Sequence, residues 1–319
     1  MMKPNKIFLH IVLFIVILCK TTFALNPEEL PQELKNEYNI PVSYTEKIIN
    51  SYKINNNILK AMDRPAESKP WVQYKKIFIN EDRMNDGISF YKEHKKTIIT
   101  VSKLYNIPPE ILVAVIGVES NYGKHNFYIK AVDALCTLAF HYKRRSHYFL
   151  SELKSFILYT YNNKLDPFNI MGSYAGAIGL PQFMPSSINS FGVDFNKDGV
   201  IDLINAYDDS LASIAQFLKK NGWETGKPSI VKIYLPAKFN KIDLFNKLYT
   251  VKQLNKMGIN LAIKVDENLK GKVIKIDRDS ENYDYWVAFN NFKTLKRYNP
   301  SDKYSLSIIL LSKNIARGF

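Results

Sequence analysis

The 319-residue sequence has only two cysteines, Cys19 and Cys136, which leaves little material for disulfides or thiol chemistry. Cys19 belongs to an N-terminal export segment, and once that segment is removed no intramolecular disulfide can form. Cys136 stands in an apolar stretch, where we expect a buried, inert thiol rather than a nucleophile. Its neighbours are Ala134, Leu135, Leu138 and Ala139. Catalysis by a cysteine nucleophile is therefore set aside.

The sequence also lacks an N-terminal apolar run of comfortable membrane-spanning length. Residues 7–19 are apolar apart from His10, follow a short basic segment and precede Thr22-Phe-Ala24, a small-x-small cleavage site. This order predicts a signal peptide at residues 1–24 that is cleaved and leads to export. Two alternatives remain open. One is an uncleaved anchor, and the other is lipid attachment at Cys19, which is disfavoured because a large leucine precedes it.

Acidic residues are scarce relative to basic ones, with 30 against 44. The export segment contains three lysines and no acid, so the mature chain carries 41 basic and 30 acidic residues, a net charge of about +11. Such an excess favours an anionic partner through long-range steering. The lysines are dispersed and no recognisable nucleic-acid module is present, so a nucleic acid is not expected to be that partner.

No internal repeat is visible, and the pattern changes once, after Gly226-Lys-Pro228. Before this point, short helices are predicted at 46–51, 57–62 and 85–104, and residues 108–225 are mainly helical with Gly-rich loops. After it, strands are predicted at 230–235, 272–276 and 285–289, with a turn at 279–282 that makes the last two a hairpin. A closing helix capped by Ser301 is predicted at 301–316. The expected fold class is α+β and mainly helical.

Glu119 is the most informative residue, because it stands near the end of a mostly apolar run from Pro108 to Ser120. The run predicts a buried helix that begins at the proline pair. A carboxyl at its far end lies beside the partly negative C-terminus and between apolar walls, and both raise its pKa. A carboxyl that stays protonated near neutral pH is what a general acid requires. The alternative is a solvent-facing glutamate in a fraying last turn.

A second motif is the Gly-rich segment from Gly172 to Ser187. Its small residues leave the backbone bare, which would let a broad ligand approach closely. Ser173 and Gln182 offer a hydroxyl and an amide for hydrogen bonds to sugar hydroxyls or acetamides. Tight helix packing of the small residues is the alternative reason for this composition.

These motifs resemble the lysozyme-like lytic transglycosylases of bacterial cell-wall turnover, which carry a Glu-Ser-x-x-Gly turn and a Gly-Ala-x-Gly-Leu-x-Gln-x-Met-Pro loop. Further stretches narrow the resemblance to the lytic murein transglycosylase B family, and it runs from about residue 28 to the C-terminus. These stretches are Arg64–Trp71, Asp133–Phe140, Arg144-Arg145 and Arg297–Tyr304.

The resemblance implies a lysozyme-like catalytic core at residues 108–227. An N-terminal helical region, 25–107, would precede it, and a small β-containing lobe with the closing helix, 228–319, would follow. In such an enzyme Glu119 is the catalytic acid. The expected surroundings are the periplasm, peptidoglycan glycan strands as substrate and wall-synthesis enzymes as possible partners, with membrane association only if the chain is lipidated.

The resemblance also assigns binding residues. Ser173 would hydrogen-bond the catalytic acid, and Gln182 would line the glycan cleft. Arg144 and Arg145 match an arginine pair near the active site, although simple surface charge would explain them as well. Tyr298-Asn299 matches a late element that returns to the cleft. Tyr122, Tyr142 and Tyr304 could supply stacking surfaces for sugar rings.

A separate pattern at Asp194, Asn196, Asp198 and Val200 is the first half of a calcium loop, with oxygen side chains at positions 1, 3 and 5, Gly at 6 and a carbonyl at 7. It offers no His or Cys for zinc. The usual glutamate at position 12 is replaced by Asn205. The resembled family has a variant loop with a later last carboxylate, for which Asp208 or, preferably, Asp209 would serve. We expect one structural Ca²⁺ and no organic cofactor; a metal-free turn is the alternative.

Hydrolytic glycosidases normally pair two carboxylates across the scissile bond, and no second one is apparent near Glu119. Asp133, the next acid, is expected to be the N-cap of a helix over 133–140. A mechanism with one carboxylate is then the simplest account, in which Glu119 first protonates the glycosidic oxygen and later deprotonates the muramyl O6 hydroxyl. The alternatives are a hydrolytic muramidase and a catalytically silent glycan-binding scaffold.

Overall fold

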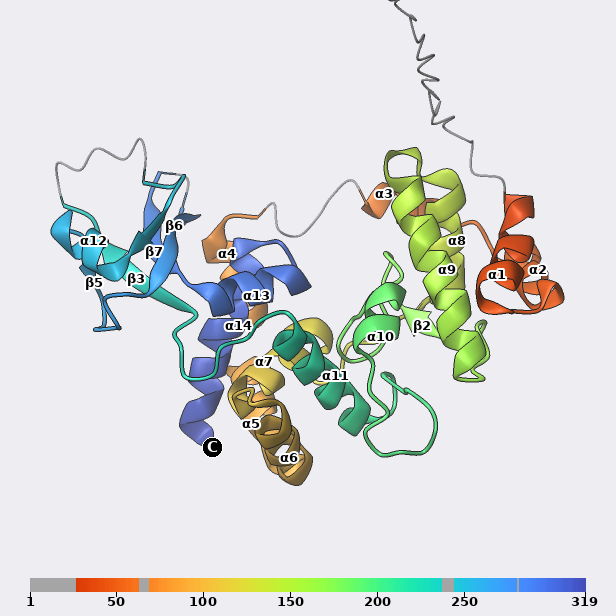
Figure 1. Ribbon diagram of the computed structural model, residues 1–319, viewed down its shortest axis with the longest axis horizontal. Helices are drawn as coiled ribbons and strands as arrows, with labels where there is room; N and C mark the ends of the chain where they lie inside the picture. The colour runs from red at the N-terminus through yellow and green to blue at the C-terminus, as the bar shows by residue number, and fades with distance from the viewer. Residues whose placement is uncertain (1–26, 63–68, 237–243, 280) are drawn as a thin grey trace, which may run out of the picture.

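The computed structural model describes residues 27–62, 69–236, 244–279 and 281–319 (Figure 1). The predicted signal peptide, Cys19 and most of the Arg64–Pro70 connection lie outside these residues. The described part is mainly helical, with one five-stranded antiparallel sheet and a two-stranded ribbon. This confirms the predicted α+β class. Figure 1 shows the sheet and the first helices at opposite ends, with α5, α6, α7 and α11 between them.

The first three helices pack against the helix pair in the middle of the chain rather than against the helices that follow them. Tyr44 on α2 donates a hydrogen bond to Thr160 on α9 (3.0 Å), and Lys154 on α9 forms an ion pair with Glu33 on α1. The helices of this bundle are α1 (Leu30–Tyr38), α2 (Val42–Ser51), α3 (Asn56–Ala61), α8 (Ala131–His141) and α9 (Ser146–Asn162).

The next helices surround the apolar helix α7 (Pro109–Ser120), which begins at the predicted proline pair. The predicted helix over 85–104 is two helices that break at His94. The helices around α7 are α4 (Trp71–Phe78), α5 (Glu81–Glu93), α6 (Lys95–Tyr105), α11 (Tyr207–Lys220) and α14 (Asp302–Ile315), while α10 (Pro185–Phe191) joins α9 to α11. Within the predicted N-terminal helical region, 25–107, the helices α1 to α3 and α4 to α6 pack on different partners.

No single helix in the described residues is both long and apolar enough to cross a bilayer, and α6 with α7 meets those criteria only as a pair bent by 114°.

The sheet has the strand order β4-β6-β7-β3-β5, with every neighbouring pair antiparallel. One face, carrying Val231, Val273 and Val287, packs with α12 in a small core. The other face, carrying Ile230, Ile274 and Ile276, joins the main core. The elements are β3 (Ile230–Tyr234), β4 (Leu248–Thr250), α12 (Val251–Lys256), β5 (Asn260–Leu261), β6 (Lys270–Asp277), β7 (Tyr283–Ala288) and α13 (Asn290–Tyr298). We call residues 230–288 the sheet lobe.

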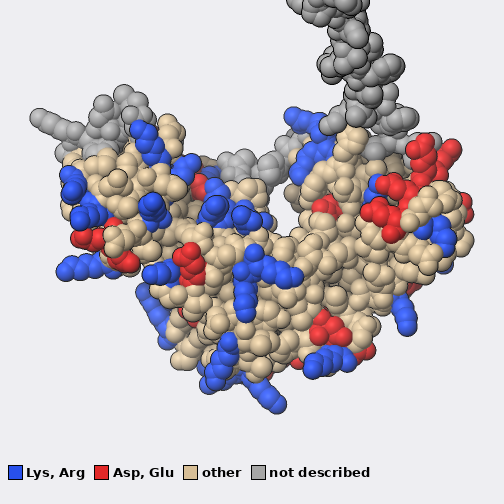
Figure 2. All heavy atoms as spheres, viewed as in Figure 1, with Lys and Arg blue, Asp and Glu red and all other residues tan. Residues whose placement is uncertain are grey.

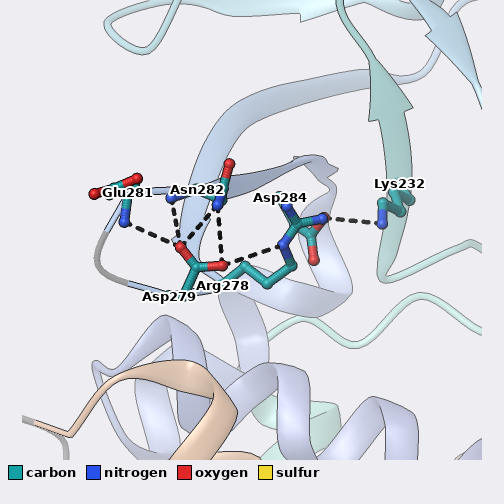
Figure 3. A network of polar contacts seen from close by, with 6 residues as sticks. All are labelled: Lys232, Arg278, Asp279, Glu281, Asn282 and Asp284. Atoms are coloured by element: carbon teal, nitrogen blue, oxygen red, sulfur yellow. Dashed lines mark hydrogen bonds and ion pairs between the residues drawn. The ribbon is translucent and has the colours of Figure 1, made fainter.

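The predicted hairpin turn is present between β6 and β7, and Figure 3 shows what closes it. The Asp279 carboxylate accepts hydrogen bonds from the backbone N–H groups of Glu281 (3.0 Å) and Asn282 (2.9 Å) and from the Asn282 amide. These bonds lower the pKa of Asp279. Lys232 on β3 forms an ion pair with Asp284 on β7 (2.9 Å), which ties the hairpin to the next strand.

The last helix, α14, is capped by Ser301 as predicted, and the Ser301 hydroxyl accepts a hydrogen bond from the Tyr304 N–H at 3.3 Å. Instead of closing the C-terminal lobe from outside, α14 packs along α7 in the main core. Helix α8 begins at Ala131, so the predicted N-cap role of Asp133 is wrong. Asp133 lies within the first turn and accepts a hydrogen bond from the Lys53 N–H (2.8 Å).

Cys136 lies fully buried on α8, as predicted, and burial raises the pKa of its thiol.

Candidate active site

Glu119 lies near the C-terminal end of helix α7, at the edge of the hydrophobic core. Every side chain from Ile111 to Val118 is buried, whereas Glu119 is half-buried. The helix stops there because Asn121 and Tyr122 adopt left-handed backbone conformations (φ 52° and 59°) and Gly123 follows with φ 82°. The Asn121 N–H returns to the Gly117 carbonyl (3.2 Å). The Glu-Ser-x-x-Gly segment of the resembled family thus forms a turn at residues 119–123.

The Glu119 carboxylate accepts a hydrogen bond from the hydroxyl of Tyr304 on α14. Tyr304 is buried, and its ring stacks against that of Tyr298 with centroids 6.3 Å apart and planes 22° from parallel. Burial and the nearby Glu119 charge raise the pKa of both phenols well above 10, so both stay protonated at neutral pH. Tyr304 is therefore a partner of the acid, and its predicted use as a stacking surface for sugars is wrong.

The Gly-rich segment folds back on itself beside this acid. Ribbon β1 (Ile129–Lys130) with β2 (Met171–Gly172) leads into it, and bridges join Gly172 to Ile178 and Ile178 to Phe183. A Cβ at Gly176 would lie 2.5 Å from Leu135, and one at Gly179 would lie 2.2 Å from the Leu203 carbonyl oxygen. Protein atoms already fill the space beside these two glycines. Tight packing, the alternative that the sequence left open, therefore explains why both positions are glycine.

Ser173 and Gln182 stabilise this loop through local hydrogen bonds and keep further hydrogen-bonding capacity. The Ser173 hydroxyl oxygen accepts hydrogen bonds from the N–H groups of Ala175 (3.3 Å) and Ala177 (3.0 Å), which leaves its proton to donate. Gln182 has φ 48°, and its amide nitrogen donates to the Gly179 carbonyl (2.8 Å). The amide oxygen of Gln182 has no hydrogen-bond partner among the described residues.

Tyr298 and Asn299 form hydrogen bonds to other segments of the protein and so position parts of the site. The Tyr298 hydroxyl donates to the Pro181 carbonyl (2.5 Å), so the end of α13 fixes the Gly-rich loop. The Asn299 side chain accepts from the Ser301 N–H (3.0 Å), which orders the turn before α14 and Tyr304. Both residues thus support elements that carry the acid and the loop.

Arg144 and Arg145 lie in a short 3₁₀ turn (Lys143–Arg145) after α8, and both are exposed. The Arg145 guanidinium lies 4.3 Å from the centre of the Tyr148 ring. Their expected binding of glycan remains a prediction.

Arg83 and the ion pair of Lys124 with Asp86, which no sequence motif indicated, secure the end of α7 and the turn that follows. Arg83 on α5 donates to the Gly117 carbonyl, and the Tyr122 hydroxyl donates to the Arg83 carbonyl (2.9 Å). Tyr122 is buried with its ring against Gly117, so it is not a stacking surface for sugars. Lys124 pairs with Asp86 (2.6 Å) and ties the turn to the same helix. Nothing local in the sequence links positions 83 and 117.

A pocket of about 270 Å³ opens between the Glu119 turn and the Gly-rich loop. No aspartate or glutamate lines it. Its outer wall includes the highly exposed Tyr128, in a stretch that no motif had indicated. The lining residues are Ser120, Gly123, His125, Asn126, Phe127, Tyr128, Met171, Gly179, Leu180 and Ile204.

Residues 23–313 match the model of the transglycosylase SLT domain. The chain is 32% identical over 308 residues to membrane-bound lytic murein transglycosylase B of Escherichia coli K12, covering 92% of this chain and 84% of the relative. The chain belongs to the lytic transglycosylase family. It is therefore an enzyme of this class, and the family expected from its motifs is confirmed.

Solved structures agree with this lytic transglycosylase assignment. The soluble lytic transglycosylase SltB1 of Pseudomonas aeruginosa superposes with a TM-score of 0.83 at 32% identity, over 91% of this chain and 98% of that one. The E. coli lytic transglycosylase Slt35, in complex with calcium, gives 0.83 at 31% identity, over 92% and 94%. The expected lysozyme-like architecture is thus confirmed.

The predicted calcium loop of this transglycosylase forms a tight turn between α10 and α11. Asp194 accepts from the N–H groups of Asp198 (3.1 Å) and Gly199 (2.9 Å), and Asn196 accepts from Asp198 (3.0 Å). Gly199 has φ 91°, a left-handed conformation that suits glycine at position 6. No group of three or more His, Cys, Asp and Glu side chains in the described residues could hold a metal. A calcium loop also uses amide and carbonyl oxygens, which Asn196 and Val200 can supply.

Asp209 closes this loop from inside the protein. Its buried carboxylate accepts from the N–H groups of Phe195 (2.8 Å), Asn196 (3.4 Å) and Asp202 (2.9 Å). Burial raises the pKa of Asp209 even though these three bonds oppose the shift. A carboxylate offers about four lone-pair sites, so about one remains for a cation. Asp208, the other candidate for the last ligand, is half-buried beside it.

Proposed function

We propose that this enzyme cleaves the β-1,4 bond between N-acetylmuramic acid and N-acetylglucosamine in peptidoglycan, forming 1,6-anhydro-N-acetylmuramic acid. The observation that carries the proposal is the carboxyl of Glu119, which emerges half-buried at the end of α7 and accepts a hydrogen bond from the buried Tyr304. Two other carboxylates are engaged elsewhere. Asp133 binds the Lys53 N–H, and the buried Glu152 binds the N–H and hydroxyl of Ser186 on α10.

In the first step Glu119 gives its proton to the glycosidic oxygen as the bond from that oxygen to muramyl C1 breaks. The 2-acetamido oxygen of the same sugar stabilises the positive charge that develops at C1. In the second step the Glu119 carboxylate takes the proton of the O6 hydroxyl, and O6 bonds to C1. Glu119 ends protonated, and no water is consumed.

The surrounding residues would bind and orient the strand. Ser173 would donate its free hydroxyl proton to the Glu119 carboxylate, and the amide oxygen of Gln182 would accept from a sugar hydroxyl or acetamide. Exposed Arg144 and Arg145 would contact the glycan farther along the strand. Tyr298 and Asn299 would act through the protein, by fixing the Gly-rich loop and the start of α14.

Mass analysis of fragments released from purified sacculi tests the reaction. Every new muramyl end should be a 1,6-anhydro end, lighter by one water than the end that lysozyme leaves. Reducing ends in their place would make the enzyme a muramidase. Strand binding with no release at all would make it a scaffold.

We also propose export to the periplasm with a mature N-terminus at Leu25, since Thr22 and Ala24 supply the small side chains that signal peptidase needs. N-terminal sequencing of the protein from the envelope fraction should return Leu25. A diacylated Cys19 would instead show a lipid-anchored enzyme, and an intact Met1 an uncleaved anchor.

We further propose that Asp194, Asn196, Asp198, the Val200 carbonyl and Asp209 hold one Ca²⁺ that stabilises the fold and takes no part in the chemistry. At 100 times its dissociation constant, calcium should stabilise the native state by about 2.7 kcal/mol and raise the melting temperature. Asp198→Ala should abolish this response. Asp166→Ala is the matched control, because Asp166 also organises a turn but lies outside the loop. A melting temperature unmoved by calcium or chelator would leave the loop as a turn only.

A further inference from the structure

A basic groove of about 520 Å³ lies between the sheet lobe and α13, separate from the pocket beside Glu119. Its floor is apolar, formed by Ile274, Ala288, Phe289 and Phe292. Its walls carry five cations and one carboxylate. Figure 2 shows Lys and Arg side chains gathered over this part of the molecule. The charged lining residues are Lys270, Lys272, Lys293, Lys296, Arg297 and Asp302.

The secondary structure places these cations on the groove. Alternate residues of β6 point to one face, so Lys270, Lys272 and Ile274 face α13 while Val273 faces the small core under α12. On α13, Lys293, Lys296 and Arg297 are spaced three and four apart and share one side of the helix. Two elements thus present like charges to the same space.

These charges are mostly unneutralised within the protein. Lys296 pairs with Asp302 (2.6 Å), and Arg297 donates to the Asn221 side chain (3.2 Å). The side-chain amines of Lys270, Lys272 and Lys293 form no hydrogen bond or ion pair with any described residue. Like charges that face each other across a cleft repel, and the resulting positive potential attracts an anion.

We propose that this groove binds the carboxylate-bearing stem peptide of a peptidoglycan strand whose muramyl residue lies at Glu119, an inference that rests on the proposed function. The groove is lined by residues of the same segments that hold the acid. Asp302 lines the groove and lies in the same first turn of α14 as Tyr304, the partner of Glu119, and Arg297 adjoins Tyr298. An extended peptide of four or five residues spans about 13–17 Å, so a stem peptide reaches well beyond the sugar that bears it.

The shape of the site favours a peptide over a membrane. The cations line a concavity between a sheet and a helix, whereas a flat lipid surface contacts side chains that project outward. The apolar floor suits small side chains such as those of alanine, and the cations suit the free carboxylates along the peptide. The groove would therefore select strands that still carry their peptides.

Binding of labelled soluble glycan strands, with stem peptides or stripped of them, tests this proposal by fluorescence anisotropy. The mature chain would carry Glu119→Gln so that strands are not cut, which makes the readout independent of turnover. Adding Lys272→Glu and Lys293→Glu should weaken binding of peptide-bearing strands about 10-fold, since each reversal replaces an attraction by a repulsion. Binding of stripped strands should not change.

The matched control is Lys252→Glu with Lys256→Glu, which makes the same charge change on exposed positions of α12 in the same lobe. It should leave both affinities within about two-fold, because screening weakens distant charges. Equal losses on both strands, no loss, or the same loss in the control would overturn the proposal. So would groove variants that lose binding to phosphatidylglycerol vesicles while keeping full affinity for peptide-bearing strands. Reducing ends released by the wild-type enzyme would refute the proposed reaction but would not change the outcome of the strand-binding measurement.

Discussion

Replacing Glu119 by glutamine is expected to lower turnover of sacculi by about 10²–10⁴-fold or more, because one residue supplies both the acid and the base. The amide keeps the size of the side chain and can still accept a hydrogen bond from Tyr304, but it cannot deliver or take up a proton. Initial rates of muropeptide release, measured by liquid chromatography, would give the loss. Strand binding should survive, since the Gly-rich loop is unchanged.

Glu110→Gln is the matched control for that variant. Glu110 lies in the first turn of the same helix, where its charge interacts with the helix dipole and is worth about 0.3–1 kcal/mol of stability. It should lower the melting temperature slightly and leave turnover intact. Full activity of the Glu119→Gln enzyme would remove Glu119 from the mechanism.

Replacing Tyr304 by phenylalanine should lower kcat by about 10–100-fold, the range that follows from losing a hydrogen bond to a charged group worth about 1.5–3 kcal/mol. The ring and its stacking on Tyr298 remain. The lost donor stabilises the ionised form of Glu119, so its removal raises the pKa of that carboxyl. Activity that needs the protonated acid should then persist to higher pH. The pH profile of kcat should show its basic limb moved upward.

Tyr159→Phe provides the control for Tyr304→Phe. Tyr159 is equally buried, and its hydroxyl donates to the Ile201 carbonyl (2.9 Å) away from the pocket. The Tyr159→Phe substitution should lower the melting temperature without moving the basic limb of the pH profile of kcat. A Tyr304→Phe enzyme with unchanged kcat and pH profile would show that the contact with Glu119 is structural only.

Features set by local sequence could be predicted. The apolar run from Pro108 fixes a buried helix, and its left-handed exit at Asn121 fixes where Glu119 emerges. The turn at Asp279 and the cap at Ser301 likewise depend on neighbouring residues. Contacts between distant segments could not be predicted. The Tyr304 hydroxyl meets a carboxylate 185 positions away, and only the family resemblance brought its motif to attention.

The same dependence on contacts between distant segments explains what the sequence did not predict. Gly176 and Gly179 are required because Leu135 and the Leu203 carbonyl leave no room for a side chain at these positions. No local sequence pattern reveals these contacts. Chain order likewise does not reveal that α3 packs on α8 and that α1 and α2 form polar contacts with α9. The role of Asp133 was wrong because the start of α8 is set by the ribbon that precedes it, two residues earlier than its sequence indicates.

Digestion of sacculi in H₂¹⁸O tests the central claim most directly, that the O6 hydroxyl of the muramyl residue and not water attacks C1. The account predicts anhydro-muramyl products with no ¹⁸O at C1, while lysozyme in the same solvent labels each new reducing end. Incorporation of one ¹⁸O per bond cleaved by this enzyme would contradict it.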